Sequence, residues 1–223
     1  MTNKSIKLSN SFFDNEAEGA YLLSPHFDDI CFSLASFSYR LKRGKIFTLF
    51  SWSANIVNEK IKFIVGAHNL KGGTEAFDYS VGLVSRLRLT EEKDFCRDIA
   101  FDLALGCFVD APLRGRHPFK DSIQNALEDT KIFSEKIRAI LESIAHPKSN
   151  QAKPLLLCPI GIGNHIDHLI VLNVIVQNLD PIRAKFRVGF YEDLPYASKS
   201  QNRQVGIDPV SYTHLTLPTK RIV

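Results

Sequence analysis

Two short apolar runs, separated by a helical pattern, constrain the fold of this 223-residue chain most strongly. Residues 20–24 (AYLLS) predict a buried strand, and residues 28–42 predict a helix that ends near Gly44, a common stop residue. Residues 45–52 (KIFTLFSW) are rich in β-branched and aromatic side chains and predict a second strand. Two strands joined by a helix pair in parallel through a right-handed crossover. We therefore expect an α/β fold, a Rossmann-like open and mostly parallel sheet with helices on both faces.

The same alternation continues along the chain to about residue 195. We expect a long loop over residues 53–84, helices over residues 85–105, 121–145 and 162–179, and strands over residues 107–110, 153–161 and 185–195. A loop of this length in a compact domain is often a functional lid. The apolar content of 44% is ordinary for a globular core, and we expect one domain over residues 1–209.

The last stretch, residues 210–223 (VSYTHLTLPTKRIV), resembles the in-frame translation of a transposon-derived sequencing adapter. An ordinary polar tail is the alternative interpretation. We treat this stretch as a non-native tail and leave it out of the fold. The domain is then expected to be truncated, with its native carboxyl end missing.

Composition argues against several classes of protein. No apolar run approaches the roughly 18 residues of a transmembrane segment, and the first residues lack the apolar core of an export signal. The formal net charge of +4 comes without a basic cluster interleaved with aromatic residues, so we expect no nucleic-acid partner. The cysteines lack CxxC spacing, which favours reduced thiols in a cytoplasmic protein. They are Cys31, Cys96, Cys107 and Cys158.

Two short motifs place metal-ligating side chains directly after predicted strands. They contribute His26, Asp28 and Asp29, and His165, Asp167 and His168. Because the carboxyl ends of parallel strands lie at one edge of a sheet, we expect the two motifs to converge.

The spacing within these motifs suits a metal site. His26 and Asp29 are three residues apart, as are His165 and His168, which turns both members of each pair to the same side of a helix start. Zinc hydrolases commonly use three His or carboxylate ligands and leave one position open for water. Asp28 is then a spare carboxylate beside the metal, where a general base should stand. Taken alone, each motif could instead be a helix N-cap or a solvated helix start.

The stretch GIGNH, residues 161–165, also invites a dinucleotide-binding hypothesis. Ile166 stands where the third glycine of that fingerprint belongs, so the match is weak. We expect the two glycines to form a tight turn that delivers His165, and we expect no dinucleotide cofactor.

The motif PHFDD at residues 25–29, together with HIDH at residues 165–168, resembles the PIG-L (LmbE-like) family of zinc-dependent N-deacetylases. Members carry a PHPDDE-type motif after the first strand and an HPDH-type motif late in the domain. The similarity extends over most of residues 20–196 and includes RLTEE (88–92), DAPLR (110–114) and YEDLPYA (191–197). Phe27, Ile30 and Ile166 depart from the family pattern, but none of these departures removes a ligand or the base.

The resemblance implies a zinc ion with three protein ligands, which are His26, Asp29 and His168. It implies Asp28 as the general base, and it places His165 near the developing oxyanion or the leaving amine, oriented by Asp167. The implied function is removal of the acetyl group from an N-acetylglucosaminyl-type amino sugar in a small or lipid-linked conjugate. The alternatives are a zinc amidase acting on a non-sugar acyl amine and an inactive sugar-binding protein of the same fold.

Two arginines are candidates for substrate contacts. Arg88 is either an exposed helix charge or a residue with a substrate or structural role. Arg114 lies in a predicted turn and is a candidate for binding an anionic part of the substrate, such as a phosphate. Glu192 and Asp193, after the last predicted strand, either bind substrate hydroxyls or only close the last turn.

Overall fold

The computed structural model describes residues 19–41, 43–53, 74–144, 153–194 and 196–203. Within them, a five-stranded sheet has the order β3-β2-β1-β4-β5, and all neighbouring strands are parallel. The strands are β1 (Ala20–Ser24), β2 (Gly44–Thr48), β3 (Phe101–Leu105), β4 (Leu155–Pro159) and β5 (Arg187–Tyr191). The open parallel sheet confirms the predicted α/β fold.

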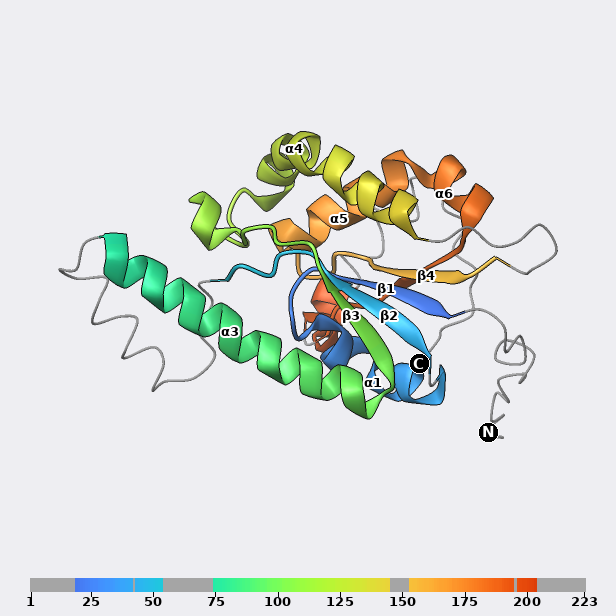
Figure 1. Cartoon of the computed structure of the whole chain (residues 1–223). Coiled ribbons are helices and arrows are strands. Elements are labelled where there is room, and N and C mark those ends of the chain that lie inside the picture. Colours follow the sequence, from blue (N-terminus) through green and yellow to red (C-terminus); the bar gives the residue numbers. More distant parts are fainter. Residues whose placement is uncertain (1–18, 42, 54–73, 145–152, 195, 204–223) are drawn as a thin grey trace, which may run out of the picture.

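Helices cover both faces of this sheet (Figure 1). One face carries α1 (Asp29–Leu41) and α3 (Thr74–Asp98), and the other carries α4 (Ser122–Ser143), α5 (Ile166–Gln177) and α6 (Leu179–Lys185). Two short 3-10 helices complete the described elements, η2 (Pro112–Arg114) and η3 (Tyr196–Ser198). Among the described residues, no helix is both long and apolar enough to cross a membrane.

Successive residues of β1 divide the core between the two faces, as the period of a strand requires. Ala20 and Leu22 pack with Ile30 and other residues of α1, whereas Leu23 belongs to the cluster that contains the buried side chains of α4 and α5. Most side chains of α5 are buried, and this helix packs against α4. Both predicted motifs are therefore anchored on elements that the core holds rigidly.

The chain between β2 and α4 differs from the prediction. We expected a helix over residues 85–105 and a strand over residues 107–110, but α3 ends at Asp98 and β3 follows at once. Ala100, with a positive φ of 59°, turns the chain between them. Because β3 is a partly exposed edge strand, its sequence carries no long buried run to mark it off from the helix. Val109 makes only an isolated bridge.

Other boundaries were predicted with mixed success. The first strand, residues 20–24, is confirmed to the residue. The loop expected over residues 53–84 is wrong from Thr74 onward, where α3 begins, and residues 54–73 lie outside the described part. Residues 210–223 also lie outside it.

Candidate active site

The two motifs lie at the carboxyl edge of the sheet, after the paired strands β1 and β4. Because β2 and β4 flank β1 on opposite sides, these loops surround the point where the strand order reverses. His26 follows β1 and Asp29 begins α1, while His165 caps α5 and is followed by Asp167 and His168 in its first turn. The motifs therefore converge in space, as their positions after strands predict.

A tight turn delivers the second motif. The backbone passes through positive φ at Gly161 (79°), Gly163 (87°) and Asn164 (57°). A Cβ atom on Gly163 would lie 2.7 Å from the side chain of Tyr196, a distance that only glycine avoids. The glycines of this segment thus form the tight turn that we expected.

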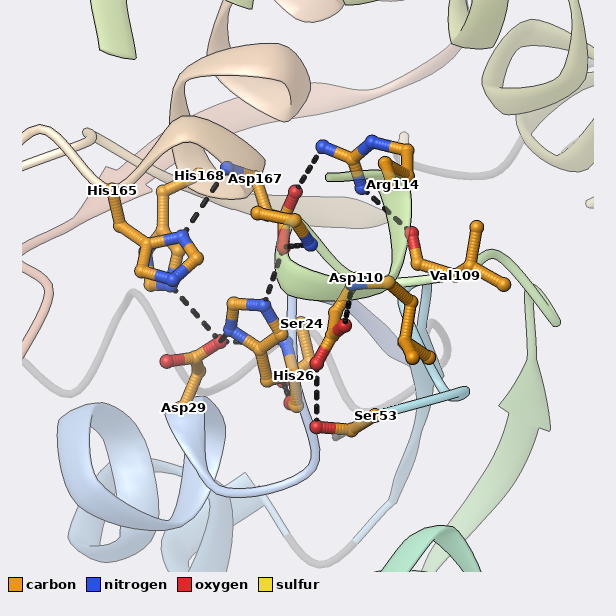
Figure 2. A network of polar contacts seen from close by, with 12 residues as sticks. Ser24, His26, Asp29, Ser53, Val109, Asp110, Arg114, His165, Asp167 and His168 are labelled. Atoms are coloured by element: carbon orange, nitrogen blue, oxygen red, sulfur yellow. Dashed lines mark hydrogen bonds and ion pairs between the residues drawn. The ribbon is translucent and has the colours of Figure 1, made fainter. Parts of the chain in front are cut away.

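Three histidine rings and a carboxylate meet at the centre of the site (Figure 2). One ring nitrogen from each of His26, His165 and His168 lies within 4.8 Å of the corresponding nitrogens of the other two. Asp29 Oδ2 lies 3.4 Å from His26 Nδ1 and 3.4 Å from His168 Nε2. The backbone N–H of His26 donates to the same oxygen at 2.7 Å, which holds the carboxylate in place.

Two buried carboxylates set which nitrogen of each imidazole faces Asp29. Asp167 Oδ2 accepts a hydrogen bond from His26 Nε2 (2.9 Å), and Asp193 Oδ1 accepts one from His168 Nδ1 (2.5 Å). In the neutral rings the lone pairs of His26 Nδ1 and His168 Nε2 would face the Asp29 carboxylate, so a cation, either a proton or a metal ion, is needed between them. His168 Nε2 is buried without a hydrogen-bond partner in the described part of the chain, as expected for a metal ligand.

His165 differs from the other two histidines. Its Nδ1 accepts a hydrogen bond from the backbone N–H of Asp167 (3.2 Å), so the neutral ring carries its proton on Nε2. Burial and the charges of His26 and His168 lower the pKa of His165 to about 2, so the ring is neutral near pH 7. Because a protonated nitrogen cannot ligate, the donor chemistry favours Asp29, rather than His165, as the third ligand.

The same contacts control the charges of the cluster. Burial opposes ionisation of Asp29, but the charges of His168 and His26 and the hydrogen bonds from His26 outweigh it and lower the pKa to about 2. Burial likewise opposes protonation of His26, yet hydrogen bonds and charges of Asp167 and Asp29 raise its pKa to about 10. A metal ion would therefore compete with a proton at this site.

Asp28 lies on the open side of the cluster. Its side chain is 39% exposed, and its Oδ2 accepts a hydrogen bond from Arg88 Nη1 at 3.2 Å. Arg88 is largely buried, and it comes from within α3, well after the start of that helix. Both residues line the pocket described below, so Arg88 is not the exposed helix charge that we considered.

Glu92, one turn further along α3, is a buried acid that we did not predict as a site residue. Its Oε1 accepts a hydrogen bond from Thr48 Oγ1 (3.2 Å), while Oε2 has no hydrogen-bond partner among the described residues. Burial, together with the charges of Asp29 and Asp28, raises the pKa of Glu92 to about 8, although the hydrogen bond from Thr48 opposes the shift. A neutral acid thus lies beside the predicted base.

A pocket of about 320 Å³ opens over the cluster. Polar side chains on its wall come from both motifs and from α3, and the aromatic side chains beside them include Phe32, Phe119 and Tyr196. Phe32 is 59% and Phe119 is 46% exposed. Exposed rings next to polar groups suit a ligand with both apolar and polar faces.

Arg114, which we expected at the substrate, is not among the described residues that line this pocket. Its guanidinium lies between Asp167 (2.6 Å) and Asp129 (3.2 Å), as Figure 2 shows for Asp167. A contact between Arg114 and a substrate stays a prediction.

The role of Asp193 was missed by the sequence analysis. This residue is 1% exposed, follows β5, and accepts hydrogen bonds from His168 and from the backbone N–H of Ile162 (2.9 Å). The sequence did carry a signal for this role, because Asp193 is an acid that follows a strand. The same pattern led us to predict Asp28 as a site residue. Only the arrangement of the strands shows that it contacts a histidine rather than a substrate hydroxyl.

Fold and site together define a Rossmann-like α/β protein with a buried His/carboxylate cluster at its switch point. The chain is 28% identical over 183 residues to 2'-N-acetylparomamine deacetylase of Streptomyces fradiae, covering 80% of this chain and 57% of that protein. The chain therefore spans little more than half the length of this curated relative. No family model matches it, so membership of the PIG-L (LmbE-like) family stays a prediction.

Solved structures of deacetylases share the fold. The A40926 pseudoaglycone deacetylase has a TM-score of 0.53 and 16% identity, over 88% of this chain and 81% of that chain. A zinc-inhibited form of a teicoplanin deacetylase has a TM-score of 0.51 and 16% identity, over 87% of this chain and 83% of that chain. At such low identities, these likenesses establish the α/β fold alone.

Proposed function

We propose that this protein is a zinc-dependent hydrolase that removes the acetyl group from an N-acetylated amino sugar in a larger conjugate. The observation that carries the proposal is the convergence of His26 Nδ1, Asp29 Oδ2 and His168 Nε2 beside the exposed carboxylate of Asp28. The similar proteins are deacetylases, which supports the reaction, and the Streptomyces relative is named for an N-acetylated amino sugar.

His26, Asp29 and His168 would hold the zinc ion. Two imidazoles and a carboxylate are a common donor set of catalytic zinc and leave a position open for water. When bound, zinc polarises the acetyl carbonyl and lowers the pKa of a water molecule toward about 7.

Asp28 accepts a proton from the water that attacks the acetyl carbon. The ion pair with Arg88, 3.2 Å long, orients this carboxylate toward the pocket that both residues line. As the C–N bond breaks, Asp28 returns the proton to the departing sugar amine, and acetate and a free amine result. Burial and the neighbouring charges lower the pKa of His165, which favours a neutral ring, so this scheme assigns the return of the proton to Asp28.

His165 stabilises the reaction differently. With Nδ1 occupied by the backbone N–H of Asp167, the neutral ring carries its proton on Nε2, and from the pocket wall this N–H donates to the carbonyl oxygen as negative charge develops there. A donor of this kind is commonly worth a few kcal/mol of transition-state stabilisation.

The aromatic side chains of the pocket support a sugar as the ligand. Phe32, Phe119 and Tyr196 would pack on the apolar face of a pyranose ring while the acetamido group reaches the histidines. The proposal covers small and lipid-linked conjugates, and it places the enzyme in the reducing cytoplasm, a setting that suits its four free cysteines.

The test is acetate release by the purified full chain. The panel of substrates comprises 2'-N-acetylparomamine, N-acetylglucosaminyl conjugates and an N-acetylated amine without a sugar. We expect release from at least one amino-sugar substrate, loss of release after treatment with a chelator, and recovery with one equivalent of zinc. Zinc-loaded protein that binds these sugars without releasing acetate would instead be a sugar-binding protein, and release from only the non-sugar amine would indicate a different amidase.

A further inference from the structure

We infer that Arg114 is a positioning residue of the metal site, which acts by holding Asp167 against His26, and not a substrate ligand. The inference rests on the proposed function in one respect, namely that His26 is a metal ligand. It concerns how the chain presents this ligand, whatever the substrate is.

The guanidinium of Arg114 is engaged at each of its three nitrogens. Nη2 donates to Asp167 Oδ1 (2.6 Å), Nε donates to Asp129 Oδ2 (3.2 Å), and Nη1 donates to the backbone oxygen of Val109 (2.6 Å). The same group lies 5.1 Å from the ring centres of Phe50 and Phe133, and only 11% of the side chain is exposed. A planar fork with this many fixed partners is a rigid support.

Asp167 connects Arg114 to the metal site, because it is bonded to both Arg114 and His26. It is fully buried, and its Oδ2 accepts hydrogen bonds from the backbone N–H of Ala111 (3.1 Å) and from His26 Nε2 (2.9 Å). Ala111 and Arg114 belong to one short segment around η2, so that segment binds both carboxylate oxygens of Asp167. Figure 2 shows the contact with Arg114. The carboxylate can then accept from His26 Nε2 in only one orientation.

The hydrogen bond to Asp167 decides which nitrogen of His26 ligates. With the proton on Nε2, the lone pair of Nδ1 faces Asp29 Oδ2, 3.4 Å away. Ligating histidines generally donate their other ring N–H to a carboxylate in this way, and loss of such a partner commonly weakens metal binding about 10- to 100-fold. Arg114 lies one step further out, where it fixes the carboxylate itself.

A substrate ligand would be placed differently. The described residues that line the pocket include Arg88 but not Arg114, and the guanidinium of Arg114 is already bonded to two buried carboxylates. An anionic substrate group would have to displace Asp167 or Asp129 to reach it. The geometry therefore favours the positioning role.

The test compares two arginine variants of the full chain in zinc titrations against a chromophoric chelator, with no substrate present. Arg114→Lys keeps the charge but cannot span three partners, and we expect its Kd for zinc to rise about 10- to 100-fold. Arg116→Lys is the matched control, because Arg116 contacts Asp129 Oδ1 (3.0 Å) but not Asp167, and its zinc Kd should stay within twofold of the native value.

A second readout needs no metal. Two-dimensional ¹H–¹⁵N NMR spectra of the histidine ring nitrogens should show the Nε2–H resonance of His26 in the native chain and in Arg116→Lys. This resonance should be absent in Arg114→Lys. A purely structural role would lower the Tm but leave this resonance and the zinc Kd unchanged. If Arg114→Lys does not fold, Asp129→Asn removes one anchor of Arg114 without touching Asp167, and a smaller rise in the zinc Kd is expected.

An unchanged zinc Kd in a folded Arg114→Lys or Asp129→Asn protein overturns the inference, and a rise in KM alone would make Arg114 a substrate ligand. Failure to bind zinc by the native chain overturns both the metal assignment and this inference. Failure of the proposed deacetylation looks different, because the native chain would then bind zinc and respond to Arg114→Lys but release no acetate.

Discussion

The two sides of the active site are built in different ways. On the ligand side, the carboxylates are buried and bonded to histidine rings or backbone N–H groups; they are Asp29, Asp167 and Asp193. On the base side, the partly exposed Asp28 lies in the turn just before α1 and pairs with Arg88 of α3, and the buried acid Glu92 comes from the same helix. The difference suits the roles proposed for them, because metal ligands must keep a fixed geometry while a general base must exchange protons with water and substrate.

Removing a residue of the ligand side should have the largest effect. We expect His168→Ala to lose zinc affinity by several orders of magnitude and to lose acetate release with it, because two donors remain. The measurement is zinc content per chain after dialysis. The matched variant is His165→Ala, which should keep stoichiometric zinc and lose about 10²- to 10³-fold in kcat. Equal loss of zinc in both variants would make His165 a ligand and contradict the division drawn above.

Removing the proposed base should greatly lower turnover without disturbing the proposed ligands. For Asp28→Asn we expect zinc content equal to that of the native chain and a kcat lower by about 10²- to 10⁴-fold, since the amide cannot take the proton of water. Asp94→Asn, at an exposed position of α3 that pairs with Arg97, is the control and should leave kcat unchanged. Native rates of acetate release from Asp28→Asn would show that the base lies elsewhere.

The buried acid of the base side predicts a smaller, pH-dependent effect on stability. The pKa of Glu92 is raised from its ordinary 4.5 to about 8, so between these values the folded state binds more protons than the unfolded state. Stability conferred by the protonated acid is therefore lost as pH rises from about 4.5 to about 8. We expect Glu92→Gln to gain on the order of a few kcal/mol over the native chain at pH 8.5, and little at pH 5.

Urea denaturation at both pH values measures this difference. Glu91→Gln on the same helix serves as the control, because Glu91 is exposed. A constant difference between the Glu92→Gln and native proteins across this pH range would mean that Glu92 is ionised when folded.

Much of the site could be predicted because its parts are local. A strand directly followed by His26 and Asp29, and a second followed by His165 and His168, place ligand types at strand ends, and the parallel sheet then brings them together. The boundary between α3 and β3 was not predictable in the same way. An edge strand buries only part of its surface, so its pattern resembles the amphipathic helix before it.

The sequence by itself determined the alternation of strands and helices, the two motifs and the residue types able to bind a metal, because these depend on periodicity and on residues close in the chain. It did not separate α6 from α5 or place β3 correctly. Tertiary structure alone decided the partner of each carboxylate. His26 and Asp167 are separated by 141 residues, yet their atoms lie 2.9 Å apart, and Asp193 reaches His168 only because β5 pairs with β4. Such contacts are set by the packing of whole elements, which no local pattern records.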